Sequence, residues 1–121
     1  MRVFKNGWFR RYAEREHISD AALKEAIVRA REGLIDANLG GGLIKQRIAR
    51  SGQGRSSGFR SVIVYRQGEV AFFVFGFAKN SVDNLNVVEL REFRKMASYL
   101  LTLDDSQIDE LMRCGQIEEV K

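Results

Sequence analysis

Three apolar segments between positions 43 and 78 set the architecture of this chain: LIKQRIA (43–49), FRSVIVYR (59–66) and EVAFFVFGFA (69–78). The first alternates apolar and polar residues with a period of two, as a half-buried strand does. The second is rich in β-branched and aromatic residues. The third is almost continuously apolar, which is typical of a central strand covered on both faces. Because Gln67 and Gly68 fit a tight turn, we predict three successive antiparallel strands.

Helical patterns precede these strands. A short strand is expected at residues 2–5, after which Asn6 can cap a first helix. Ser19 is a candidate N-cap for a second helix. The apolar residues of that helix recur at the spacing of one buried stripe: Leu23, Ala26, Ile27, Ala30 and Leu34.

Helical patterns also follow the strands. Asp83 or Asn84 is expected to cap a helix at about residues 85–101, and a short last helix begins near residue 105 and stops at Gly115. The inward-facing residues of the longer helix are predicted to be Leu90, Phe93, Ala97 and Leu100. The order β-α-α-β-β-β-α-α predicts an α+β fold, a small twisted antiparallel sheet with helices packed on one face.

The length of 121 residues fits one domain, in which residues 1–103 form the main body and residues 104–121 add a short helix and an acidic tail. With His17 and Cys114 as the single histidine and cysteine, a transition-metal site would lack ligands, so no metal or cofactor is expected. No apolar run is long enough to span a bilayer and no secretory signal is evident, so we expect a cytoplasmic protein without membrane contact.

Charge is distributed unevenly along the chain. Residues 37–68 contain six basic side chains and no acidic one. Such a block is typical of a surface that binds a polyanion, most often nucleic acid, and the alternative is a solvated face without a partner. Residues 104–121 reverse the balance with six acidic side chains. This segment either packs its apolar residues onto the core or folds over the basic block and weakens its activity.

The basic residues are expected to converge on one face of the sheet. Strand geometry puts Lys45 and Arg47 on the same face, about 6 to 7 Å apart. Arg60 lies across from them if residues 50–57 fold back as a hairpin loop, and Lys79 can supply a fourth cation. By the same alternation Tyr65 belongs to the core, and Arg66 is an exposed edge charge.

The residues RSSGFR (55–60), the alternating strand with Lys45 and Arg47, and the ending FAKN (77–80) resemble the RelE/HigB branch of the RelE/ParE toxin superfamily. The resemblance covers roughly residues 2–100 and implies the toxin of a type II toxin–antitoxin module. Members of this branch are ribosome-dependent endoribonucleases that cleave mRNA. A small antitoxin, here expected to be a helix-turn-helix protein, neutralises them.

By motif position, the resemblance makes Lys45, Arg47, Arg60 and Lys79 the catalytic or phosphate-binding cations. Further RNA contacts are expected from Arg50, Arg55, Ser57 and Asn80. RNA supplies its own nucleophile, the 2′-hydroxyl, so a cluster of lysine and arginine can act on it without a metal. Two alternatives stay open: a ParE-like inhibitor of DNA gyrase, and an RNA-binding module without catalytic activity.

Overall fold

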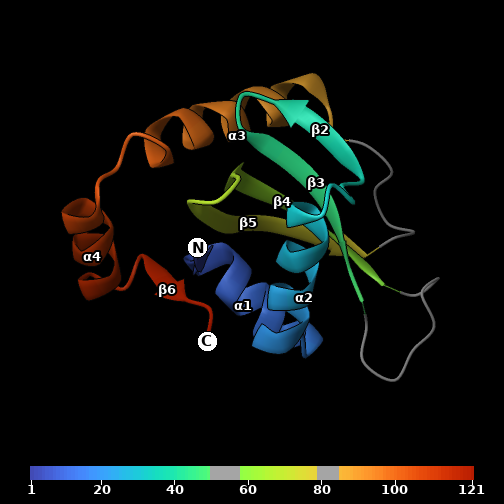
Figure 1. Cartoon of the computed structure of the whole chain (residues 1–121), viewed down its shortest axis with the longest axis horizontal. Coiled ribbons are helices and arrows are strands. Elements are labelled where there is room, and N and C mark those ends of the chain that lie inside the picture. The colour runs from blue at the N-terminus through green and yellow to red at the C-terminus, as the bar shows by residue number, and fades with distance from the viewer. Residues whose placement is uncertain (50–57, 79–84) are drawn as a thin grey trace.

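The computed structural model describes residues 1–49, 58–78 and 85–121 of the chain. Figure 1 shows helices packed on a twisted sheet, which confirms the α+β class. The elements are, in chain order, β1 (Arg2–Asn6), α1 (Gly7–Glu16), α2 (Asp20–Arg31), β2 (Ala37–Gly40), β3 (Leu43–Ile48), β4 (Phe59–Arg66), β5 (Val70–Ala78), α3 (Val87–Leu100), α4 (Asp105–Arg113) and β6 (Ile117–Glu119).

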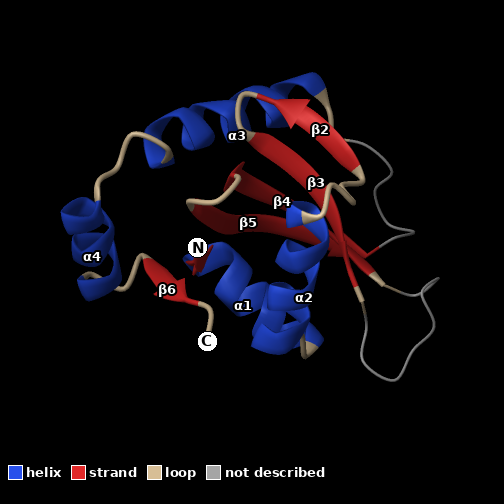
Figure 2. Cartoon of the chain, viewed as in Figure 1, coloured by secondary structure: helices blue, strands red, loops and turns tan. Residues whose placement is uncertain are grey.

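The described strands form one sheet in the order β2-β3-β4-β5-β1-β6 (Figure 2). The pairs β3–β4 and β4–β5 are antiparallel, as predicted, whereas β1 lies parallel to β5. The strand β5 pairs with β4 and β1, and its apolar side chains are buried on both faces: Ala71 and Phe73 belong to one apolar cluster, and Phe72 and Val74 to the other. The central position predicted for this strand is therefore confirmed.

Each face of the sheet carries its own apolar cluster. Ile44, Ile63 and Phe73 point to the face that α1 and α2 cover. Their neighbours along the strands, Leu43, Val62 and Val64, belong to a second cluster, to which Ala97 and Leu100 of α3 and Ile108 of α4 contribute. The alternation of the sequence with a period of two thus separates the residues into two cores.

Local capping signals place the first two helices. Asn6 and Ser19 are the N-caps, and their side chains accept hydrogen bonds from the backbone N–H of Phe9 and Ala22. In α3 the cap is Asn86, which forms a reciprocal capping box with Glu89. The N-cap therefore lies two or three residues after the predicted Asn84 or Asp83, that is, at Asn86 and at neither of those two residues.

The sequence analysis was wrong at three further points along the chain. The helix α2 ends at Arg31, so Leu34 does not extend the buried stripe and is 60% exposed. Leu90 is only half-buried in α3, where Ala97 and Leu100 are the buried residues. The strands β2 and β6 are additions to the predicted order. They are only four and three residues long, and pairing with β3 and β1 stabilises them.

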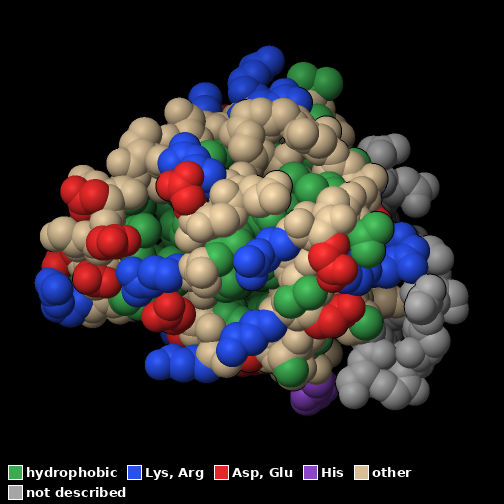
Figure 3. All heavy atoms as spheres, viewed as in Figure 1, with side chains coloured by type: hydrophobic (Ala, Val, Ile, Leu, Met, Phe, Trp, Pro, Cys, Tyr) green, Lys and Arg blue, Asp and Glu red, His purple; other side chains and the backbone are tan. Residues whose placement is uncertain are grey.

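The acidic C-terminal segment packs onto the body of the protein. Ile108 of α4 and Ile117 of β6 are buried, and β6 pairs with β1 at the edge of the sheet opposite β2. Figure 3 shows acidic side chains over α4 and β6. This side of the molecule is opposite the end of β3 and the start of β4. Of the two readings of this segment, packing onto the core is confirmed and folding over the basic block is wrong.

Candidate nucleic-acid interface

The antiparallel register of β3 and β4 brings three cations onto one face. Arg47 lies directly opposite Arg60, and Lys45, two residues along β3, lies opposite Val62. Residues opposite each other in an antiparallel pair share a face, so Lys45, Arg47 and Arg60 do so. We call these three residues the cation face. The predicted convergence of these residues is confirmed, without any conclusion yet about their roles.

Two arginines opposite each other on neighbouring strands repel one another. Arg47 Nε and Arg60 Nη1 are also buried, and neither has a hydrogen-bond partner among the described residues. A buried N–H donor without a hydrogen-bond partner lowers the stability of the folded protein, so such donors are rare in native structures. An anionic ligand explains these two, because it accepts both hydrogen bonds and offsets the repulsion.

Asp36 lies against the cation face, and the sequence analysis did not single it out. Its Oδ2 is 3.1 Å from Nε of Arg60, and the two side chains are 30% and 15% exposed. One feature of the sequence could have drawn attention to Asp36: it is the last acidic residue before residues 37–68, which contain none. The site therefore holds three cations and one carboxylate.

Buried polar side chains support the cation face from below. Gln46 lies between Lys45 and Arg47 on β3 but points to the opposite face, where it is fully buried. Its Nε2 donates to the backbone oxygens of Ala26 and Leu34, at 2.9 and 3.0 Å. The hydroxyl of Ser61 donates to the backbone oxygen of Gln46. These bonds fix β3 against α2 and β4 at the level of the cations.

The remaining predicted site residues fall in two stretches of the sequence, residues 50–57 and 79–84. Lys79 and Asn80 follow β5, and Arg50, Arg55 and Ser57 lie between β3 and β4. All five lie outside the described residues, so their predicted roles are not tested.

Beside the cation face lies a hollow of about 290 Å³, lined by Glu25, Arg29, Leu34, Arg47 and Ala49. Arg29 Nη2 donates to the backbone oxygen of Arg47, and its Nε lies 3.0 Å from Oε1 of Glu25. Arg29 therefore links α2 to β3 at this position.

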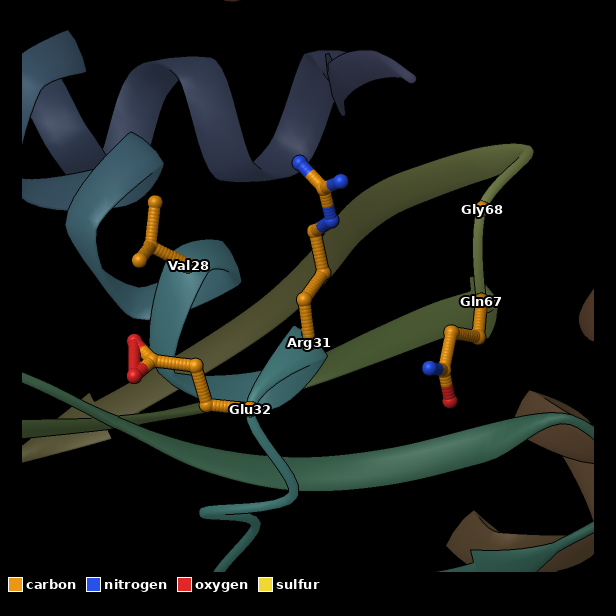
Figure 4. Close-up of a pocket in the computed structure, with 5 residues that line it drawn as sticks. All are labelled: Val28, Arg31, Glu32, Gln67 and Gly68. Carbon is orange, nitrogen blue, oxygen red and sulfur yellow. The ribbon is translucent and has the colours of Figure 1, made fainter.

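A second hollow, of about 390 Å³, lies far from the cations (Figure 4). It is formed by Val28, Arg31 and Glu32 from the end of α2, and by Gln67 and Gly68 from the turn after β4. Tyr65, near this turn, packs against the α2-side core as predicted. Burial raises the pKa of the Tyr65 phenol, against the opposing effect of the Arg31 charge.

The acidic residues of the C-terminal segment have basic partners of their own. Arg2 contacts Glu119, Asp109 and Asp105. Lys5 lies 2.8 Å from Asp20 and 3.5 Å from Glu118. Burial opposes ionisation of Asp20, but hydrogen bonds from Lys5 and the backbone N–H of Lys121 hold its pKa below the usual range. These ion pairs balance charge at the β1–β6 end of the sheet, which is the end opposite β2.

The described residues contain neither a cluster of metal-binding side chains nor a membrane-spanning helix. Within residues 1–49, 58–78 and 85–121, no group of His, Cys, Asp and Glu is arranged to hold a metal ion. None of the helices described has the length and apolar character that crossing a membrane requires.

The fold and the cation face together define a small α+β protein suited to bind a polyanion. The family model for the RelE toxin of the RelE/RelB toxin–antitoxin system matches residues 1–120. The chain therefore belongs to the RelE toxin family. It is the toxin component of a toxin–antitoxin system, which implies a cognate antitoxin as its partner. A comparison with curated proteins finds no match.

Proposed function

We propose that this toxin is a ribosome-dependent endoribonuclease that cleaves mRNA at the cation face. One observation carries the proposal: Lys45, Arg47 and Arg60 share one face of β3 and β4, and two of their buried N–H donors have no partner among the described residues. A phosphodiester fits such a site because its anionic oxygens accept charge-assisted hydrogen bonds from guanidinium groups.

The reaction needs three functions from the protein. Lys45 accepts the proton of the RNA 2′-hydroxyl as a general base, and the 2′-oxygen then forms a bond to the neighbouring phosphorus. Arg47 and Arg60 stabilise the negative charge that develops on the pentacoordinate phosphate. The bond from phosphorus to the 5′-oxygen breaks, and that oxygen takes up a proton. The products are a 2′,3′-cyclic phosphate and a 5′-hydroxyl.

Residues of the undescribed stretches complete the proposal. Lys79 follows β5 and is assigned to charge stabilisation or to protonation of the 5′-oxygen. Arg50, Arg55, Ser57 and Asn80 are assigned to binding the RNA around the reacting phosphate. The antitoxin is proposed to be a small helix-turn-helix protein, and the site of action the cytoplasm, where ribosomes and mRNA are available.

Growth arrest and mRNA cleavage after induced expression test the function. We expect Lys45→Ala to lose both effects with an almost unchanged melting temperature, because a partly exposed cation contributes little to stability. Arg60→Ala should also lose both effects, but with a lower melting temperature, because it leaves the Asp36 carboxylate without its partner. The matched control is Arg113→Ala, which removes an exposed arginine of α4 and should remain toxic. Full toxicity of both site variants would refute the catalytic assignment. Toxicity without mRNA cleavage would instead support the gyrase-inhibitor alternative.

A further inference from the structure

We infer that Asp36 is a positioning residue, which orients the guanidinium of Arg60 so that its remaining N–H groups face the phosphate. The inference rests on the proposed function, because it assigns Asp36 a task only if Arg60 binds the reacting phosphate. The carrying observation is the ion pair between Asp36 Oδ2 and Arg60 Nε at 3.1 Å.

Asp36 contacts Nε of Arg60, so it can orient the guanidinium without using the N–H groups of the two terminal nitrogens. A guanidinium has five N–H donors in a rigid planar fork. Asp36 forms its ion pair with Nε, at the base of the fork, and Nη1 is left without a hydrogen-bond partner among the described residues. The ion pair at Nε limits rotation of the fork, and Asp36 does not use the outer donors.

Asp36 is itself held in place from the other side. Its backbone N–H donates to Oε1 of Gln46 at 3.2 Å. Gln46 is fully buried, and its Nε2 is bonded to the backbone oxygens of Ala26 and Leu34. The connection therefore runs from the core of α2 through Gln46 to Asp36 and then to Arg60.

The ion pair also spans the strand that carries the other two cations. Asp36 directly precedes β2, which pairs with one side of β3, and Arg60 lies on β4, which pairs with the other side. The Arg60 side chain is 15% exposed and that of Asp36 30%, so solvent and salt screen this pair less than a pair of fully exposed groups. The ion pair across β3 restricts the Arg60 side chain, which otherwise has many rotamers. It also places one negative charge among the three cations.

Single-turnover cleavage of ribosome-bound mRNA tests the inference. Because small errors in the placement of a reacting group cost about 100-fold in rate, we expect Asp36→Asn to lower the maximal rate by roughly 10- to 100-fold. The concentration for half-saturation should stay the same, since the charge of Arg60 remains. Asp36→Glu should recover part of the rate. The control is Asp109→Asn, which removes a carboxylate paired with an arginine at the far edge of the sheet.

A double-mutant cycle separates positioning from a merely structural role. Arg60→Lys keeps the charge but has no Nε fork, so Asp36→Asn should not slow the Arg60→Lys protein further. In NMR spectra of the wild type, the Arg60 Nε–H signal should be protected from exchange with water, and Asp36→Asn should remove that protection. This second measurement does not depend on activity, and Asp36→Glu serves for it if Asp36→Asn is poorly folded.

The outcomes distinguish the inference from the function on which it rests. A wild-type rate for Asp36→Asn together with an inactive Arg60→Ala protein would overturn the role of Asp36 and leave the cation face intact. Equal slowing by Asp36→Asn in the wild-type and Arg60→Lys backgrounds would also overturn it, because Asp36 would then act independently. A wild-type rate for Arg60→Ala would instead overturn the proposed function.

Discussion

Replacing Gln46 by leucine tests whether the buried amide holds the cation face in place. The substitution keeps a side chain of similar size in a fully buried position. It removes three hydrogen bonds: two donated by Nε2 to the carbonyls of Ala26 and Leu34, and one accepted by Oε1 from the N–H of Asp36. The change is therefore one of polar contacts, with little change of volume.

The expected loss of stability follows from these contacts. A net contribution of about 1 kcal/mol for each hydrogen bond gives roughly 3 kcal/mol. The apolar leucine recovers part of this, and the carbonyl of Ala26 keeps its place in the helical ladder of α2. We therefore expect the free energy of unfolding to fall by about 2 to 3 kcal/mol, which lowers the melting temperature of a domain of this size by roughly 10 °C.

Urea and thermal unfolding at neutral pH measure this loss. The matched control is Gln67→Leu in the exposed turn after β4, which should change the free energy of unfolding by less than about 0.5 kcal/mol. Gln46→Leu should also reduce mRNA cleavage under conditions where it is folded, because Asp36 loses its anchor. A destabilisation below about 1 kcal/mol would refute the view that Gln46 fixes this region.

Three further predictions concern charge and the C-terminal segment. Binding of single-stranded RNA should weaken with salt at a log–log slope of about −2 if Lys45, Arg47 and Arg60 each contact a phosphate, and Arg60→Ala should reduce the slope by about 0.7; a slope near zero would contradict the interface. Because the pKa of Asp20 is lowered in the folded state, its contribution to stability is present above about pH 4 and is lost as the pH falls through the folded-state pKa. Asp20→Asn should therefore flatten the loss of unfolding free energy on acidification, and a curve identical to the wild type would argue against this. We also propose that residues 104–121 belong to the same domain as residues 1–103, so deleting them should lower the melting temperature without raising RNA cleavage; faster cleavage would restore the autoinhibitory reading.

The sequence was sufficient to predict the central strands and the first two helix caps. The alternation at residues 43–49 and the almost continuous apolar run that ends at residue 78 are local patterns, the first typical of a half-buried strand and the second of a central one. Asn6 and Ser19 were recognisable because their side chains bond the backbone only three residues ahead.

The missed elements depend on contacts that are distant in sequence. The strand β2 is four residues long, too short for its alternation to be a reliable signal, and its pairing with β3 places Ala37 opposite Lys45. The strand β6 is three residues long and pairs with β1, more than 100 positions earlier. Neither has a local signal, because the hydrogen bonds that define a strand come from its partner.

In the candidate site, too, some residues could be predicted from local sequence and one could not. Lys45 and Arg47 could be placed on one face from spacing alone, and Arg60 followed from the assumption of a hairpin. The pairing of Asp36 with Arg60 could not be foreseen, because Asp36 lies in a connection without periodic pattern and its position depends on the tertiary bond to Gln46.

Cleavage of mRNA on purified ribosomes by the purified toxin tests the central claim most directly. We predict that the wild type cuts ribosome-bound mRNA and leaves a 2′,3′-cyclic phosphate and a 5′-hydroxyl. Lys45→Ala and Arg60→Ala, each shown to be folded by a cooperative unfolding transition, should cut at least about 100-fold more slowly, the scale of a lost general base or a lost charge-stabilising donor. Intact mRNA with the wild type, or wild-type cleavage by both variants, would contradict the assignment of the cation face as the catalytic site.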